Sequence, residues 1–394
     1  MPTAVLDIDL AEPLPGIKGF ENYDRALVLI RFKRCPVGRA QVFLDKGRIE
    51  AMKLRDALIR SAGSALRERV THDYIKWDSV RFSGSNTPPV TVAICTRDRT
   101  EDLRRCLAAL EKLDYRDYEV LVIDNCPHTE STRDLVRMLD KVRYVREEKP
   151  GLNRARNRAL YEARNEIVAF TDDDAAPDPE WLSSLIRNFD HPLVLCVTGL
   201  TMPLELETEA QELFEKYCPF GRGFRRRVYT NRVVSPLAAA RVGAGANMAV
   251  RRSLLEKVGP FDVSLDAGTR THSGGDTDIF SRILSAGYHI VYDPAAVSWH
   301  RHRRSREELT KTLYGYGVGT YAFWTRHLMD GRPGVIRIAA KWFFSHQVRS
   351  LILSLLKSRG SMPSDLLFAE LRGALAGPLS FIRSRRESRV VDGK

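Results

Sequence analysis

The sequence lacks three features that would place the protein outside the cytoplasm or across a membrane. None of its six cysteines stands at C-x-x-C spacing, so we predict reduced thiols rather than a zinc site or a disulfide framework. The N-terminus carries acidic residues where a signal peptide has basic ones, and no apolar stretch follows, so export is not expected. Basic residues interrupt the apolar segment 335–356, which therefore lacks the roughly 18 uninterrupted apolar residues of a membrane span. We expect a cytoplasmic location, either in the bulk or at the cytoplasmic face of a membrane.

Composition points to a globular protein with a polyanionic partner. The chain has 394 residues, of which 43% are hydrophobic and 28% charged, enough for one large domain with appendages. Its net charge of +12 suits nucleic acid, an anionic membrane surface or a phosphorylated substrate. Charge alone does not choose among these three.

The first part of the chain, residues 1–85, is expected to form a small α+β appendage. Its alternating apolar runs and turn residues predict a short hairpin followed by a helix and a linker. The expected elements are a strand at 25–32, a turn at 36–38, a returning strand at 39–44, a helix at 49–70 and a linker at 83–89.

The central part, residues 86–330, alternates strand-like runs with helical patterns, as in an α/β fold with a mainly parallel sheet. The expected strands are 90–95, 118–123 and 167–171, with 194–198 a further candidate, and a helix is expected at 103–110.

The last part, residues 331–394, is expected to hold amphipathic helices and a basic tail. Segment 335–356 mixes apolar and basic residues, which suits a helix lying in a membrane interface beside anionic lipid or one packed on the protein itself. Both alternatives stay open. The basic stretch 383–389 is expected to be disordered.

Three consecutive carboxylates are the most informative feature of the central part. Asp172, Asp173 and Asp174 directly follow the apolar run 167–170, so they should emerge at the carboxyl end of a buried strand. Three like charges raise one another's pKa unless a cation lies among them. Mg²⁺ or Mn²⁺ carrying a diphosphate would satisfy them, because hard oxygen ligands suit these ions. The alternative is a solvated acidic turn.

Polar side chains also follow two other predicted strands. Thr96, Asp98 and Arg99 come after the first, and Asp124 after the second. Parallel strands bring their ends to one edge of the sheet, so one pocket can collect all of them. There Asp accepts from a ribose hydroxyl or a base N–H, and Arg offsets phosphate charge.

A loop that turns into a helix precedes the strand with the three carboxylates. Gly151 suits the turn, and the first N–H groups of the helix would favour an anion. Asn153, Arg156 and Asn157 share one helical face. Taken alone, the segment also fits a basic solvated helix.

Taken together and in order, these motifs resemble the nucleotide-sugar half of a family 2 glycosyltransferase with the GT-A fold, a Rossmann-like sheet flanked by helices. The resemblance covers about residues 88–325. It rests on segments 96–99, 124–125, 150–157, 171–174, 243–249, 274–278 and 299–303.

The resemblance implies an inverting enzyme that moves a sugar from a nucleotide-diphosphate donor to an acceptor hydroxyl. Asp276 occupies the place of the catalytic base, with Asp278 as a rival. The commoner family pattern has Glu before this Asp, whereas this chain has Gly275, which puts any role of a preceding carboxylate in doubt. A third metal ligand could come from His300 or His302, and we favour His300.

The resemblance also implies the remaining site residues and partners. Asp174 and Asp172 would hold Mn²⁺ or Mg²⁺ together with His300. The nucleotide-sugar contacts would be Thr96, Asp98, Arg99, Asp124, Asn153, Arg156, Asn157 and Asp172. The acceptor would be a glycan, a lipid-linked molecule or a small molecule, in polysaccharide, glycolipid or other glycoconjugate synthesis. Peripheral contact with an anionic membrane is compatible with this activity, and nucleic acid is not an expected partner.

Two segments outside these motifs have a predicted role. The Gly-, aromatic- and Arg-rich stretch 214–227 fits an acceptor loop or a mobile surface loop, and the glycines of 314–319 are expected to allow close helix packing.

Three other functions compete with the glycosyltransferase. A nucleic-acid-binding protein would explain the charge but not the grouped carboxylates, which repel phosphate. A GT-A-like nucleotidyltransferase would carry a Gly-rich, Lys-containing first loop, which segment 96–99 does not resemble. A non-catalytic sugar-binding homologue would not need Asp172, Asp174 and Asp276 intact.

Overall fold

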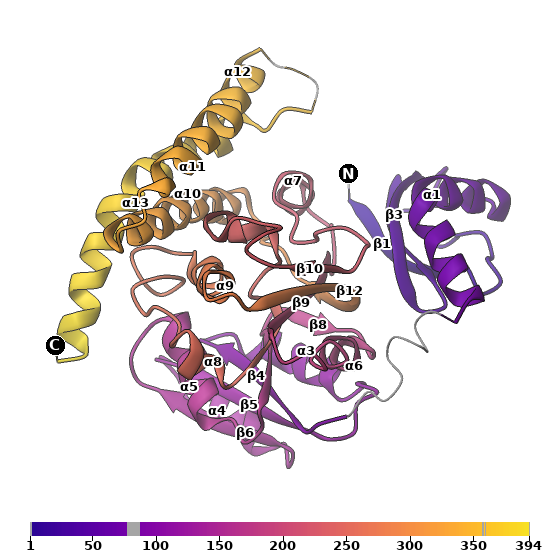
Figure 1. The fold of residues 1–394 in the computed structure, drawn as a ribbon. Coiled ribbons are helices and arrows are strands. Elements are labelled where there is room, and N and C mark those ends of the chain that lie inside the picture. Colours follow the sequence, from indigo (N-terminus) through magenta and orange to yellow (C-terminus); the bar gives the residue numbers. More distant parts are fainter. Residues whose placement is uncertain (1, 77–86, 357, 359, 394) are drawn as a thin grey trace.

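The structure has an N-terminal sheet with a helix, a central α/β part and a C-terminal group of helices (Figure 1). This group begins at residue 306, inside the range 86–330 that the sequence analysis expects for the central part. The structure is a computed structural model that describes residues 2–76, 87–356, 358 and 360–393. Residues 83–86 of the predicted linker lie outside the described residues.

The N-terminal part is a three-stranded sheet packed on one helix. Its elements are β1 (Thr3–Asp9), β2 (Arg25–Phe32), β3 (Cys35–Phe43) and α1 (Ala51–Tyr74). Strand β1, which the sequence analysis missed, pairs in parallel with β2, and β2 pairs antiparallel with β3. Leu54 and Leu58 of α1 are buried against this sheet.

The turn of this hairpin lies at Lys33 and Arg34, so the turn predicted at 36–38 is wrong. Both residues have positive φ, 48° and 65°, as a tight two-residue hairpin loop requires. Pro36 lies inside β3, at a shift of register on an edge strand, where its missing N–H is tolerated.

The central part contains one mixed sheet with helices on both faces. Its elements are β4 (Val90–Thr96), α3 (Thr100–Leu110), β5 (Tyr118–Asn125), α4 (Ser131–Arg137), β6 (Val142–Glu147), α5 (Leu152–Glu162), β7 (Ile167–Asp172), β8 (Ala175–Pro177), α6 (Trp181–Ile186), β9 (Val194–Pro203), α7 (Glu209–Tyr217), β10 (Arg227–Tyr229), the 3-10 helix η1 (Pro236–Arg241), β11 (Asn247–Arg251), α8 (Leu254–Lys257), α9 (Gly275–Ser285) and β12 (His289–His300).

The sheet order is β10-β12-β9-β11-β7-β4-β5-β6, with β8 paired to β12. Strands β6, β5, β4 and β7 run parallel, as predicted. Strand β11, however, lies antiparallel between β7 and β9, so the sheet is mixed rather than mainly parallel.

Alternation along the strands divides the core between two layers. Val92 and Ile94 of β4 face the layer that includes α3 and α6, whereas Ala93 faces the layer that includes α5 and α9. With both faces covered, the sheet offers its strand ends as the place for polar chemistry.

The C-terminal part consists of helices that pack beside this sheet. They are α10 (Arg306–Met329), α11 (Gly334–Trp342), the π-helix η2 (Phe343–Val348), α12 (Arg349–Leu355) and α13 (Ser364–Val391). The predicted helix 335–356 thus exists, interrupted by a π-helical turn. No helix among the described residues combines the length and apolar character needed to cross a membrane.

The disorder predicted for 383–389 is wrong, because this stretch belongs to α13. Tertiary contacts hold it: Phe381 is buried beside Leu265, and the Ser384 hydroxyl donates to the Ser264 carbonyl at 2.7 Å. A charged sequence can be helical where one face has such partners.

Candidate active site

The sheet register places the predicted site residues side by side at one edge. Thr96 of β4 is opposite Asp124 of β5, and Cys95 is opposite Asp172 of β7. The ends of three neighbouring strands therefore meet, as the sequence predicts.

Asp172, Asp174 and His300 form a compact group at this edge. Each contributes one potential ligand atom, and these atoms lie within 4.8 Å of one another. His300 Nε2 is 3.1 Å from Asp174 Oδ1 and 3.8 Å from Asp172 Oδ2. The histidine reaches the group because β8, directly after the carboxylates, pairs with the end of β12.

Burial and mutual charge shift the pKa of all three members of this group. Burial raises the pKa of Asp172, and the neighbouring Asp174 raises it further. Burial also acts to raise the pKa of Asp174, but the charges of His300 and Arg99 outweigh it and hold that pKa below its usual value. In turn, burial lowers the pKa of His300 while the two carboxylates raise it, with a net increase.

The donor set fits a divalent ion such as Mn²⁺ or Mg²⁺. Two carboxylates and an imidazole suit Mn²⁺, and carboxylates alone suit Mg²⁺. Asp174 Oδ1 is buried and pairs with His300 Nε2 at 3.1 Å, so an ion bound by both residues would take the place of this contact.

Asp173, to which sequence reasoning gave no role, organises the neighbouring side chains. It is buried and accepts hydrogen bonds from the Thr96 hydroxyl at 2.8 Å and from Arg99 at 3.2 Å. Arg99 also donates to Asp174 at 3.1 Å. Thr96 and Arg99, predicted as nucleotide contacts, thus bind the acidic cluster. Burial and the adjacent Asp174 raise the pKa of Asp173 to about 7.

Asp124 and Asp98 differ in their surroundings. Asp124 is fully buried, and its Oδ2 accepts from the Tyr144 hydroxyl at 3.0 Å, while Oδ1 has no partner. Burial raises the pKa of Asp124 to about 6. Asp98 has a positive φ of 55° and accepts from the backbone N–H of His128 at 2.9 Å, which lowers the pKa of Asp98.

The predicted helical face of α5 is buried and forms hydrogen bonds with the loop at residues 261–266. Asn157 exchanges two hydrogen bonds with the backbone of Phe261, and Asn153 donates to the Asp262 carbonyl at 2.8 Å. Arg156 is also buried and donates to Asp266 at 2.8 Å. The alternative of a solvated helix is therefore wrong for this face.

The free N–H groups expected at the start of α5 are partly occupied. The Gly151 amide donates to Asn125 Oδ1, and the Leu152 amide donates to the Ala267 carbonyl. These two amides are therefore not available to an anion.

Asp276 and Asp278 lie two residues apart on α9 but in different environments. Asp276 is partly exposed, and its Oδ2 accepts from the Gly245 amide at 2.8 Å. Asp278 is fully buried, with Arg282 and Arg326 each at 2.9 Å. Helical geometry turns the two side chains about 200° apart, so Asp276 faces solvent while Asp278 joins the packing between α9 and α10.

The surroundings of Gly275 explain why no carboxylate precedes Asp276. A Cβ atom at Gly275 would lie 2.3 Å from Asn153 Nδ2 and 2.4 Å from Asp266 Oδ2. Asp266, which sequence reasoning missed, fills this place from a distant loop. Asp266 has a positive φ of 83°, and no turn residue in the sequence indicated this conformation.

The two candidate histidines have different partners. His302 Nε2 is 3.2 Å from Glu215 Oε2, and its ring packs on Phe214, whereas His300 faces the carboxylates. Phe220, from the predicted acceptor loop, packs edge-on against His300 with ring centroids 5.3 Å apart. Arg303 lies 3.4 Å from Asp174 and adds positive charge beside the group.

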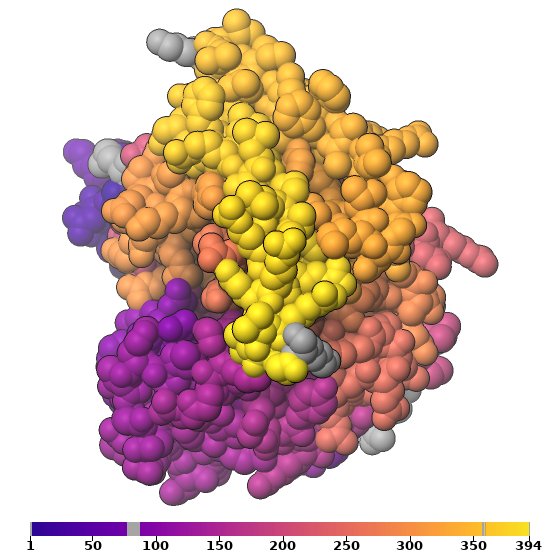
Figure 2. All heavy atoms as spheres, turned by 90° about the vertical axis from the view of Figure 1, so that its left-hand side faces the viewer, coloured from indigo at the N-terminus to yellow at the C-terminus, as the bar shows by residue number. Residues whose placement is uncertain are grey.

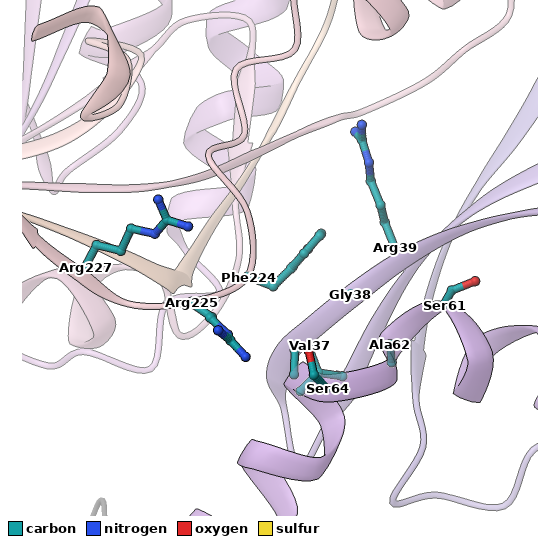
Figure 3. A pocket seen from close by; sticks show the side chains of 10 residues that line it. Val37, Gly38, Arg39, Ser61, Ala62, Ser64, Phe224, Arg225 and Arg227 are labelled. Atoms are coloured by element: carbon teal, nitrogen blue, oxygen red, sulfur yellow. The ribbon is translucent and has the colours of Figure 1, made fainter. Parts of the chain in front are cut away.

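A separate hollow of about 290 Å³ lies away from these carboxylates (Figure 3). It opens between the N-terminal part and the segment that precedes β10, and Arg39, Phe224 and Arg225 line it. Arg225 pairs with Glu68 of α1 at 2.9 Å. The hollow thus marks the contact of two parts of the fold.

Comparisons with known proteins match the central part. Residues 91–259 match the family model "Glycosyl transferase family 2". The chain is 29% identical over 258 residues to the pre-mycofactocin glycosyltransferase of Mycobacterium tuberculosis, covering 64% of this chain and 51% of that protein. It is 27% identical over 251 residues to glycosyltransferase AglE of Haloferax volcanii, covering 61% and 75%. The chain thus spans about half the length of the first of these relatives.

A solved structure has a similar fold. The mannosyltransferase PcManGT from Pyrobaculum calidifontis, in complex with GDP-Man and Mn²⁺, aligns with a TM-score of 0.51 at 17% identity. The alignment covers 79% of this chain and 98% of that one. This likeness confirms the predicted GT-A fold.

Proposed function

We propose that this chain, whose residues 91–259 match the family model "Glycosyl transferase family 2", transfers a sugar from a nucleotide-diphosphate donor to an acceptor hydroxyl with inversion. The observation that carries the proposal is the group of Asp172, Asp174 and His300 at the strand ends. The relatives' names and the Mn²⁺ complex of the similar structure support the same activity.

We propose Asp276 as the general base. Its partly exposed carboxylate would take the proton of the acceptor hydroxyl as that oxygen bonds to the anomeric carbon. The bond from the anomeric carbon to the diphosphate breaks at the same time, and the nucleoside diphosphate leaves from the opposite face. Asp278 is not proposed, because its carboxylate is fully buried between arginines.

Charge on the leaving diphosphate needs compensation. A divalent ion held by Asp172, Asp174 and His300 would neutralise the diphosphate oxygens. Arg303, at 3.4 Å from Asp174, would add a fixed positive charge beside them. We propose Mn²⁺ or Mg²⁺ as the ion.

Asp124 and Asp98 are proposed to hold the nucleoside. Asp124 Oδ1 is buried and unpartnered, so it can accept an N–H group of the base. Burial acts to lower the pKa of Arg156, whereas the charges of Asp172 and Asp276 both act to raise it. We propose that the Arg156 guanidinium orients the metal-binding carboxylate and the general base. The proposed roles of Thr96 and Arg99 are to fix the carboxylates, and those of Asn153 and Asn157 to fix loop 261–266.

The acceptor is proposed to be a glycan, a lipid-linked molecule or a small molecule. A cytoplasmic location at or near a membrane is likewise proposed, and the net charge of +12 supports it. The grouped carboxylates speak against nucleic acid as a partner.

Two substitutions test the proposal with a panel of nucleotide sugars. We expect Mn²⁺ plus the correct donor to raise the unfolding temperature of the wild type, since ligands that bind the folded state stabilise it. Asp174→Ala should abolish the Mn²⁺-dependent shift and turnover. Asp276→Asn should keep the shift but lower turnover about 10³-fold, because it cannot take the proton.

Asp140→Asn, at an exposed position before β6, is the matched control and should behave as the wild type. Full activity in excess chelator would refute the metal role. An active Asp276→Asn enzyme would refute the assignment of the base.

A further inference from the structure

Residues 331–363 have an unusual composition. They contain no Asp or Glu, although the whole chain has 50 such residues in 394. Their basic residues are Arg332, Arg337, Lys341, Arg349, Lys357 and Arg359. The segment is therefore positively charged with no carboxylate of its own to offset that charge.

The same segment exposes large apolar side chains. The exposed fractions of Ile336, Phe344, Leu355 and Leu356 are 60%, 66%, 64% and 70%. Further exposed apolar side chains of this segment are Trp342, Phe343, Ile352 and Leu353. Eight exposed large apolar side chains in one segment indicate a place of interaction.

Apolar and basic residues adjoin on this surface. Positions 336, 340, 343 and 344 recur at the spacing of one helical face, and all four residues are exposed. Arg337 and Lys341 are also exposed, each one position after a member of this row. An apolar row edged with cations is the pattern of an interfacial helix.

The segment is attached to the protein along a narrow line. Of residues 334–355, Val335 and Gln347 alone are buried. Gln347, in the π-helical turn, accepts from the Tyr321 hydroxyl at 2.9 Å and donates to Glu370 at 3.2 Å. Figure 1 shows α12 projecting beyond the body of the molecule, so a flat surface can reach it.

The positive charge of this segment distinguishes between its three possible partners. A second copy of the chain that packed through residues 331–356 would bring two sets of four basic residues together without one carboxylate from either segment. Nucleic acid would offset the charge but leave the Phe, Ile and Leu side chains against phosphate. An anionic lipid surface satisfies both, because headgroups pair with Lys and Arg while the interface takes up apolar side chains.

We propose that residues 331–356, the docking segment, bind the surface of an anionic membrane. Ile336, Phe343 and Phe344 enter the interface, and Arg337 and Lys341 lie at the level of the lipid phosphates. The inference goes beyond the proposed sugar transfer and does not depend on it.

Sedimentation of the full-length protein with vesicles tests the inference without donor or metal. Wild type should sediment with vesicles of phosphatidylcholine and phosphatidylglycerol but not with phosphatidylcholine alone. Ile336→Glu combined with Phe344→Glu should weaken binding at least about tenfold, because two apolar contacts are lost and two anions added. Arg337→Gln combined with Lys341→Gln should weaken it roughly 30-fold, since each basic residue near such a surface contributes about fivefold.

Phe43→Glu is the matched control, because Phe43 is 78% exposed but lies on β3 of the N-terminal part. It should bind as the wild type does, and all variants should unfold at the wild-type temperature. Equal binding to neutral and anionic vesicles, or wild-type binding by the Ile336/Phe344 double variant, would overturn the proposal. The proposal would also be overturned if light scattering showed that the wild type is a dimer and that this double variant is a monomer.

Discussion

At the scale of single residues, contact partners separate carboxylates that look alike in the sequence. Asp172 and Asp174 face the group with His300, whereas Asp173 between them holds Thr96 and Arg99. Asp172 ends β7, whereas Asp173 and Asp174 form the turn into β8, so the turn sets where the last two side chains point. The sequence predicted the cluster, and the environment of each member came only from the packing around it.

The hydrogen bond from the Tyr144 hydroxyl to Asp124 leads to one prediction at the residue scale. The folded-state pKa of Asp124 is about 6, above the roughly 3.9 expected in the unfolded chain, so this group lowers stability as pH rises from about 4 to 6. Tyr144→Phe removes the donor that lowers this pKa. We expect a loss of about 1–3 kcal/mol in the free energy of unfolding at pH 8 and a smaller loss at pH 5, where Asp124 is protonated.

Urea unfolding at both pH values measures this difference. The control is Tyr118→Phe, which removes a hydroxyl that donates to the Leu110 carbonyl at 2.8 Å. That bond joins two neutral groups, so its loss should cost the same at both pH values. A pH-independent cost for Tyr144→Phe would contradict the account.

At the scale of elements, glycines let α10 and α13 approach closely. A Cβ atom on Gly317 would lie 2.1 Å from the Glu370 carbonyl oxygen, and one on Gly373 would lie 2.1 Å from the Tyr314 carbonyl oxygen. The close packing predicted for 314–319 is thereby confirmed. The partner helix, 50 residues later in the chain, could not be identified from this pattern alone.

Gly317→Ala should destabilise the protein by about 1–3 kcal/mol, because the methyl group must displace backbone rather than a flexible side chain. Gly334→Ala at the start of α11 is the control, since no atom lies within 4 Å of the new methyl group. There the higher helix propensity of alanine should stabilise the protein by about 0.5–1 kcal/mol. The midpoints of urea unfolding should move in opposite directions; equal shifts would contradict the packing argument.

At the scale of the whole molecule, α13 joins the C-terminal helices to the candidate site. Figure 2 shows it crossing from the other C-terminal helices to the part of the chain that includes α5. Arg154 of α5 pairs with Asp392 at 2.8 Å, and Glu387 pairs with Arg270 at 2.6 Å. The loop 261–274, which leads into α9 and Asp276, thus rests on a helix that begins near the docking segment.

Phe381→Ala tests this connection. Phe381 is buried with Leu265, so its truncation should lower stability by about 3 kcal/mol and loosen loop 261–274 together with α13. Hydrogen exchange should report faster exchange in both segments. Leu375→Ala, 83% exposed on the same helix, should change neither. Unchanged protection of loop 261–274 in Phe381→Ala would show that α13 does not support this loop.

The division of the chain at residues 85 and 330 stays a prediction, as do the proposed roles of the site residues. The α/β class and the meeting of three strand ends were readable from the sequence, because apolar periodicity and parallel pairing are local rules. The tight turn at Lys33 and Arg34 was not, because no Gly or Asn marked it.

The sequence by itself determined the resemblance to family 2 glycosyltransferases, the strand ends that carry the carboxylates and the basic, acid-free character of the docking segment. Each of these follows from residues that are neighbours in the chain. Only the tertiary structure decided that Asp266 pairs with Arg156, that Asp276 and not Asp278 is accessible, and that His300 joins the carboxylates. Those contacts join residues up to 128 positions apart, such as Asp172 and His300, and long-range packing and burial select them.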